Sequence, residues 1–198
     1  KYPRKGHLPL VSQIGCTLQE DLKRRDFSIN PIAKRTTNGE IIDYFNGIGD
    51  IEKKVLRVLH DESFEDDPTR IIRGLKFSVR LGFELEEHTK MLQDKYLSDI
   101  NYDMSYHRIR KELTETFNLN KAEAYDKFKE QKIYKLLGKD VGLPKISGCD
   151  IEQTVNENMN VTNKNIWLFY IIPFVEEGFS IENIYPTKQE RKIIECTS

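Results

Sequence analysis

Residues 66–83 place the strongest limit on the fold of this 198-residue chain. An α-helix turns about 100° per residue, so Ile71, Leu75 and their apolar neighbours fall on one side of this segment. Pro68 suits a first helical turn, where its missing N–H removes no hydrogen bond, and the carboxylate of Asp67 favours a helix N-terminus. The segment therefore predicts an amphipathic helix with one apolar face.

Two kinds of polar residue lie beside that apolar face. Arg73, Lys76 and Arg80 form a basic stripe, which either contacts a primer or triphosphate or is solvated. Asp67 stands three residues before Arg70, so a carboxylate and a guanidinium share the first turn. Such a pair either caps the helix as an ion pair or presents a Watson–Crick-like edge to a nucleobase. In the second case the carboxylate accepts from an amine and the guanidinium donates.

The pattern of the chain changes near residue 60. Before this point residues 8–14 look extended, Thr17 begins a capping-box pattern and Asn38-Gly39 marks a hairpin turn. A strand is expected at 55–59. Beyond it, helical spacing recurs in residues 66–83, 85–97, 105–118, 121–130 and 132–138, and again from 150 and from 186. We therefore expect a mostly α protein, with a short α/β portion followed by an all-helical region.

The composition indicates a protein of a reducing cytoplasm. The three cysteines are far apart and form no Cys-x-x-Cys motif. The longest apolar stretch, residues 166–175, is shorter than the roughly 20 residues of a bilayer span and predicts a buried helix that ends near Pro173. The net charge is −1, so any contact with RNA needs a local basic patch.

Four short motifs follow one another along the chain. They are Arg24-Arg25-Asp26-Phe27-Ser28-Ile29-Asn30, Asp43-Tyr44-Phe45-Asn46-Gly47-Ile48-Gly49-Asp50, Asp66-Asp67-Pro68-Thr69-Arg70 and His107-Arg108-Ile109-Arg110-Lys111-Glu112-Leu113. Together they resemble motifs of the class II tRNA nucleotidyltransferase and bacterial poly(A) polymerase family. Ser28, Ile48 and Asp66 replace residues that are more usual there. The resemblance covers residues 1–118.

The resemblance implies a division of the chain into three parts. Residues 1–60 would be the C-terminal part of an α/β nucleotidyltransferase head domain. Residues 61–140 would be a helical neck that binds the nucleobase, and residues 141–198 part of a helical body.

The resemblance also implies roles for particular residues. Asp67 and Arg70 would read the nucleobase. Arg25, Asp26 and Asn30 would lie near the sugar and phosphates, although Asp26 could instead form a supporting salt bridge with Arg24 or Arg25.

Basic residues of the neck would have supporting roles in the same site. Arg73 would bind the nucleotide, and Arg108 would reach its phosphates or hold the neck helices together. Lys76 and Arg80 would contact RNA or phosphate, with a solvated helix face as the alternative.

By the same resemblance, the full-length protein would be a template-independent RNA nucleotidyltransferase. It would add CMP and AMP to the 3′ end of tRNA, with CTP, ATP and Mg²⁺ as partners. The Asp-x-Asp carboxylates that hold Mg²⁺ in the family have no counterpart in this chain. We therefore expect a fragment or a natural truncation that is inactive alone and holds no catalytic or metal-binding residue. Addition of CC, A or poly(A), and a non-catalytic RNA- or protein-binding module, remain alternatives.

Overall fold

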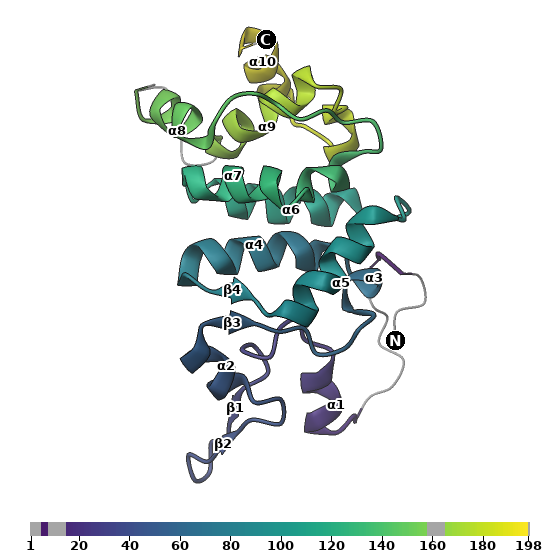
Figure 1. Cartoon of the computed structure of the whole chain (residues 1–198), viewed down its shortest axis with the longest axis vertical. Coiled ribbons are helices and arrows are strands. Elements are labelled where there is room, and N and C mark those ends of the chain that lie inside the picture. Colours follow the sequence, from purple (N-terminus) through teal and green to yellow (C-terminus); the bar gives the residue numbers. More distant parts are fainter. Residues whose placement is uncertain (1–4, 8–14, 158–164, 198) are drawn as a thin grey trace.

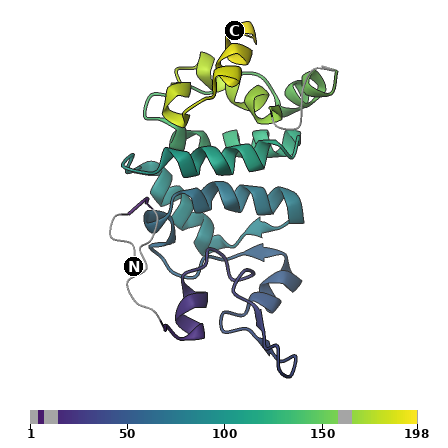
Figure 2. The same cartoon turned by 180° about the vertical axis from the view of Figure 1, so that it is seen from behind.

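The computed structural model describes residues 5–7, 15–157 and 165–197. The extended segment expected at 8–14 lies outside these residues. Figure 1 shows the described elements as stacked layers, and Figure 2 shows the same order from behind. The expected mostly α fold is confirmed, because the described strands form only two short two-stranded sheets.

The first layer is the small α/β portion. Its elements are α1 (Leu18–Lys23), β1 (Ala33–Lys34), β2 (Ile41–Ile42), α2 (Gly47–Lys53) and β3 (Val55–Leu56). The capping box of Thr17 and Glu20 and the β1–β2 hairpin are both confirmed. Gly47 is required at the start of α2, since a Cβ there would lie 2.1 Å from the carbonyl oxygen of Ser28.

The second layer contains the long helix expected from the sequence. Its elements are α3 (Ser63–Asp66), α4 (Thr69–Leu81), β4 (Glu84–Leu85) and α5 (Glu87–Ser98). The prediction of one helix over 66–83 is wrong at its start, because Asp67 has an extended backbone between α3 and α4. Pro68 disfavours a helical conformation at the residue before it.

β4 was also missed, because a helix was expected from residue 85. This two-residue strand pairs in parallel with β3.

The remaining helices lie on the other side of α4, where two of them pack against it and the later ones pack beyond these two. They are α6 (Tyr106–Phe117), α7 (Ala122–Glu130), η1 (Ile133–Leu137), α8 (Gly148–Glu157), α9 (Ile166–Glu176), η2 (Ile181–Ile184) and α10 (Lys188–Thr197). The helix expected to end near Pro173 continues to Glu176 with Pro173 inside it. α9 is apolar and mostly buried, so its packing outweighs the hydrogen bond that proline removes. None of the described helices has the length and apolar character needed to cross a bilayer.

One hydrophobic core runs through these layers. Phe27 of the first layer packs edge-on against Phe77 of α4, with ring centroids 6.0 Å apart. Further on, Phe117 of α6 stacks on Tyr170 of α9 at 5.3 Å. α4 therefore has packed neighbours on both sides, and its first turn lies where the α/β portion meets the helices.

Candidate functional site

Asp67 lies at the junction of α3 and α4 with a buried carboxylate, 5% exposed. Its Oδ1 accepts hydrogen bonds from the backbone N–H of Thr69 at 3.2 Å and from the Thr69 hydroxyl at 2.6 Å. Its Oδ2 accepts one from Nη2 of Arg108 on α6. Asp67 therefore pairs with Arg108, and the alternative of an Asp67–Arg70 ion pair is wrong.

Arg70 lies in the first turn of α4 and is 3% exposed. Its Nη1 donates to the Ser63 hydroxyl at 2.6 Å and lies 3.4 Å from Nε2 of His60. Its Nη2 donates to the carbonyl oxygen of Arg24 at 3.0 Å. Burial, and then the charge of Arg70, hold the pKa of His60 below its usual value. Arg70 thus joins the α/β portion to α3 and α4.

Asp26 forms a second connection between the α/β portion and α4. It accepts from the Phe27 backbone N–H at 3.0 Å, from Asn30 Nδ2 and from Arg73 Nε at 2.6 Å. Burial would raise the pKa of Asp26, but the charge of Arg73 and the Asn30 donor bring it below its usual value.

The alternative salt bridge of Asp26 with Arg24 or Arg25 is wrong. Both arginines pair with Asp21 instead, at 2.6 and 3.6 Å. Arg25 is exposed.

The basic stripe of α4 faces acidic residues of α6. Lys76 is 4% exposed, and its Nζ lies 2.6 Å from carboxylate oxygens of both Glu112 and Glu115. Arg73 Nη1 lies 3.4 Å from Glu112. A solvated stripe is therefore wrong for Lys76, whose charge two carboxylates already match, whereas Arg80 is exposed.

Arg108 keeps an unused donor beside Asp67. Its Nη2 also lies 3.3 Å from the Thr69 hydroxyl. Its Nη1 is buried and has no hydrogen-bond partner among the residues that the structure describes. Arg108 holds α6 against the start of α4, as one sequence alternative proposed, and still has a group available for a ligand.

Ser63, Glu112 and Glu115 complete these networks, and sequence reasoning missed all three. Ser63 stands in no motif. Glu112 belongs to the fourth motif, and its spacing after Arg108 places it in the next turn of the same helix. That spacing alone does not reveal that Glu112 faces Lys76.

No metal site is formed by the described ranges 5–7, 15–157 and 165–197, where no three His, Cys, Asp or Glu side chains cluster as ligands would. These residues therefore do not fit the Mg²⁺ that the family resemblance implies.

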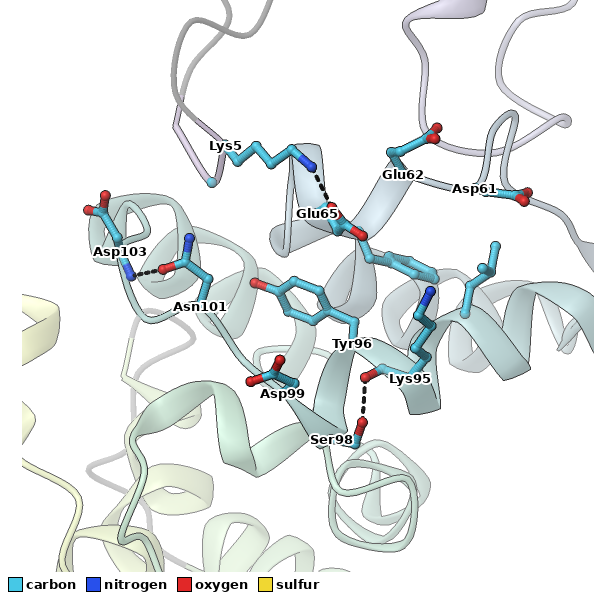
Figure 3. A pocket seen from close by; sticks show the side chains of 13 residues that line it. Lys5, Asp61, Glu62, Glu65, Lys95, Tyr96, Ser98, Asp99, Asn101 and Asp103 are labelled. Atoms are coloured by element: carbon cyan, nitrogen blue, oxygen red, sulfur yellow. Dashed lines mark hydrogen bonds and ion pairs between the residues drawn. The ribbon is translucent and has the colours of Figure 1, made fainter.

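An acidic cavity of about 660 Å³ lies on α3 and α5, apart from these networks. Figure 3 shows its labelled side chains, including Lys5 directed at Glu65. Carboxylates outnumber lysines in its lining, which contains Asp61, Glu62, Glu65, Asp99, Asp103, Lys5 and Lys95. Its excess negative charge opposes the binding of a triphosphate.

Known proteins resemble this chain over parts of its length. Residues 2–57 match the model of the poly A polymerase head domain. The chain is 48% identical over 94 residues to an A-adding tRNA nucleotidyltransferase of Aquifex aeolicus (strain VF5), covering 46% of this chain and 11% of that protein. It is 50% identical over 76 residues to a CCA-adding enzyme of Leuconostoc citreum (strain KM20), covering 37% of this chain and 19% of that one.

Solved structures extend the likeness to most of the chain. A CCA-adding enzyme in its apo form II has a TM-score of 0.75 at 25% identity, covering 96% of this chain and 48% of that one. The Thermotoga maritima CCA-adding enzyme complexed with tRNA has a TM-score of 0.73 at 25% identity, covering 90% and 47%.

The fold is that of a nucleotidyltransferase in which part of the head domain is followed by helices. The matched head segment, the four motifs and the helices around α4 all agree with this fold. Over the segments that align, the chain is similar to members of the class II tRNA nucleotidyltransferase family. It spans about half the length of these solved relatives.

Proposed function

We propose that this chain is part of a template-independent RNA nucleotidyltransferase that adds CMP and AMP to the 3′ end of tRNA. Its role within that enzyme is to select the incoming CTP or ATP. The observation that carries the proposal is the fixed position of Asp67 and Arg70. Both are buried at the start of α4, one held by Arg108 and the other by Ser63.

Base selection follows from the hydrogen-bonding capacity of these two side chains. A carboxylate offers about four lone-pair sites, so Asp67 can accept from an exocyclic amine while it retains Arg108. The guanidinium of Arg70 donates to a ring nitrogen or carbonyl of the base. Cytosine and adenine both place an amine beside such an acceptor, and small rotations of the two side chains accommodate either.

The neighbouring residues support this site in the proposal. Asp26 and Arg73 hold the α/β portion against α4, and Asn30 fixes Asp26. The exposed Arg25 and the unused donor of Arg108 are the groups available to the sugar and phosphates.

We further propose the three parts expected from the sequence: head portion 1–60, neck 61–140 and partial body 141–198. The tRNA 3′ end, CTP and ATP are the proposed partners, and the cytoplasm the proposed location. The exposed free thiols of Cys16 and Cys149 agree with a reducing compartment. The divalent metal of the reaction, proposed to be Mg²⁺, would be held by carboxylates outside this chain.

An enzyme that adds only A is a second candidate. Two relatives named A-adding tRNA nucleotidyltransferase align over 94 residues, whereas relatives named CCA-adding enzyme align over 75 or 76.

The test uses the full-length protein that contains this chain. Transcripts of tRNA that lack the 3′-terminal CCA or only its A would be incubated with each of the four nucleoside triphosphates. Asp67→Ala and Arg70→Ala should each abolish the preference for CTP and ATP, because either change removes half of the base-reading edge. Lys53→Ala, an exposed position on α2, is the matched control and should retain the preference.

Two results would overturn different parts of the proposal. Unchanged discrimination in both alanine variants refutes base reading by Asp67 and Arg70. Failure of the unmutated full-length protein to extend either transcript refutes the enzymatic function.

A further inference from the structure

An exposed pair of stacked rings lies where α6 meets η2. The ring centroids of His107 and Tyr185 are 4.0 Å apart, with 8° between the ring planes. Tyr185 is 56% exposed, and His107 is exposed as well. Because both residues are exposed and their rings are parallel, the pair presents a flat aromatic face to solvent rather than filling the core.

The backbone of Tyr185 is held in a conformation that bulky residues rarely adopt. Its φ of 52° and ψ of 61° lie in the left-handed region, and Pro186 follows directly. The Tyr185 carbonyl accepts from Arg110 Nη1 at 2.6 Å. Arg110 in turn donates to both carboxylate oxygens of Glu190, at 2.8 and 3.0 Å. Backbone strain that surrounding groups fix in this way is a feature of functional sites.

The ring pair also lies close to the candidate nucleotide site. His107 directly precedes Arg108, whose guanidinium binds Asp67. Lys111 stands four residues after His107, one turn along the same helix face, and its side chain is 72% exposed. An aromatic face beside an exposed ammonium matches the two parts of a single-stranded nucleic acid, its bases and its phosphates.

We propose that His107 and Tyr185 form a stacking platform for an unpaired base of RNA, with Lys111 contacting an adjacent phosphate. The inference rests on the proposed function for the identity of the RNA as a substrate. Stacking tolerates any base, so the platform positions the strand, whereas Asp67 and Arg70 select the nucleotide.

The test compares two substitutions at Tyr185 in the full-length protein. Tyr185→Asn removes the ring but tolerates a left-handed backbone, and Tyr185→Phe retains the ring. The probes are an RNA hairpin with a three-nucleotide single-stranded 3′ overhang and the same hairpin with a blunt end. A 2-aminopurine in the overhang reports stacking through fluorescence quenching.

Tyr185→Asn should weaken binding of the overhang hairpin by about 5- to 150-fold, the range for one lost base stack. It should also relieve the quenching and leave binding of the blunt hairpin unchanged. Tyr185→Phe should behave as the unmutated protein. Equal weakening of both hairpins, no weakening of either, or the same loss in the Phe and Asn variants would each overturn the platform.

A second variant covers the case in which Tyr185→Asn does not fold. His107→Ala removes the other ring from an exposed helix position, and it should also weaken binding of the overhang hairpin and not of the blunt one. Unchanged binding of the overhang hairpin by this folded variant, or equal weakening of both hairpins, would count against the platform.

The platform and the proposed function fail in distinguishable ways. If quenching depends on Tyr185 but the unmutated protein adds no nucleotide, the platform is supported and the enzymatic function is refuted. If the full-length protein adds nucleotides and the Tyr185→Asn variant binds the overhang hairpin as tightly as the unmutated protein, only the platform is refuted.

Discussion

Two carboxylates of α6 share the buried ammonium of Lys76 unequally. Glu112 is 6% exposed and also contacts Arg73, whereas the Glu115 side chain is 45% exposed. Loss of one partner from a buried charge pair leaves an uncompensated charge, while an exposed pair contributes little. The same lysine therefore offers two substitutions with different expected costs.

Glu112→Gln should destabilise the protein by about 3 kcal/mol, because the buried charges of Lys76 and Arg73 lose their shared partner. Glu115→Gln, the matched control on the same helix, should cost less than about 1 kcal/mol. Urea denaturation followed by circular dichroism measures both. Equal losses would show that Glu112 has no special part in the contact between α4 and α6.

His60 should make stability depend on pH in a defined window. Burial and the Arg70 charge lower its pKa in the folded protein, whereas an unfolded histidine titrates near 6.5. The unfolded chain therefore binds the proton more readily. The stability present above about pH 6.5 should be lost as the pH falls through the lowered folded value.

The measurement is the urea midpoint at pH 7.5 and at pH 5.5. His60→Gln should show a smaller decline between these values than the unmutated protein. His88→Gln, at an exposed position beside Asp61, should retain the full decline because His60 is still present. A decline in His60→Gln equal to that of the unmutated protein would contradict the prediction.

At the scale of elements, sequence reasoning located most helices but not their junctions. The amphipathic spacing of residues 69–81 repeats over several turns, so it predicts α4 well. β3 and β4 have two residues each, too few for an alternating pattern to appear. Their pairing depends on the packing of α2 and α4 around them. The predicted helix end near Pro173 was wrong for a related reason. Burial of α9 outweighs the tendency of proline to end a helix.

The candidate site also shows that local sequence patterns do not predict contacts between distant segments. Motif resemblance singled out Asp67, Arg70, Asp26 and Arg108, and the structure brings these residues to one junction. Their partners are set by contacts between distant segments, as in Arg73 with Asp26, 47 residues apart in sequence. No local pattern encodes such a pairing, so the sequence left Lys76 either to contact RNA or phosphate or to be solvated, and did not predict its pairing with Glu112.

At the scale of the whole molecule, Arg110 attaches the last helices to the rest. From α6 it donates to the carbonyl oxygen of Ile184, at 3.0 Å, as well as to Tyr185 and Glu190. Its guanidinium also lies 5.4 Å from the ring centroid of Trp167. One side chain thus contacts α9, η2 and α10.

Arg110→Ala should loosen η2 and α10 while α6 stays folded. Hydrogen exchange should accelerate in residues 181–195 and change little in residues 111–117. The control is Arg191→Ala, which removes only an exposed pair with Glu182 and should leave the exchange pattern unchanged. Accelerated exchange in both segments would mean that Arg110 supports the whole helical region rather than its end.

The contact of Asp26 with Arg73 has a practical consequence for chimeric proteins built from this chain and its relatives. A crossover near residue 60 would appear natural, since the α/β portion ends there. Yet this ion pair and the Arg70–Arg24 hydrogen bond both span that point. Parental sequences recombined there must supply complementary partners on the two sides, or the hybrid will contain an orphaned buried charge beside the proposed nucleotide site.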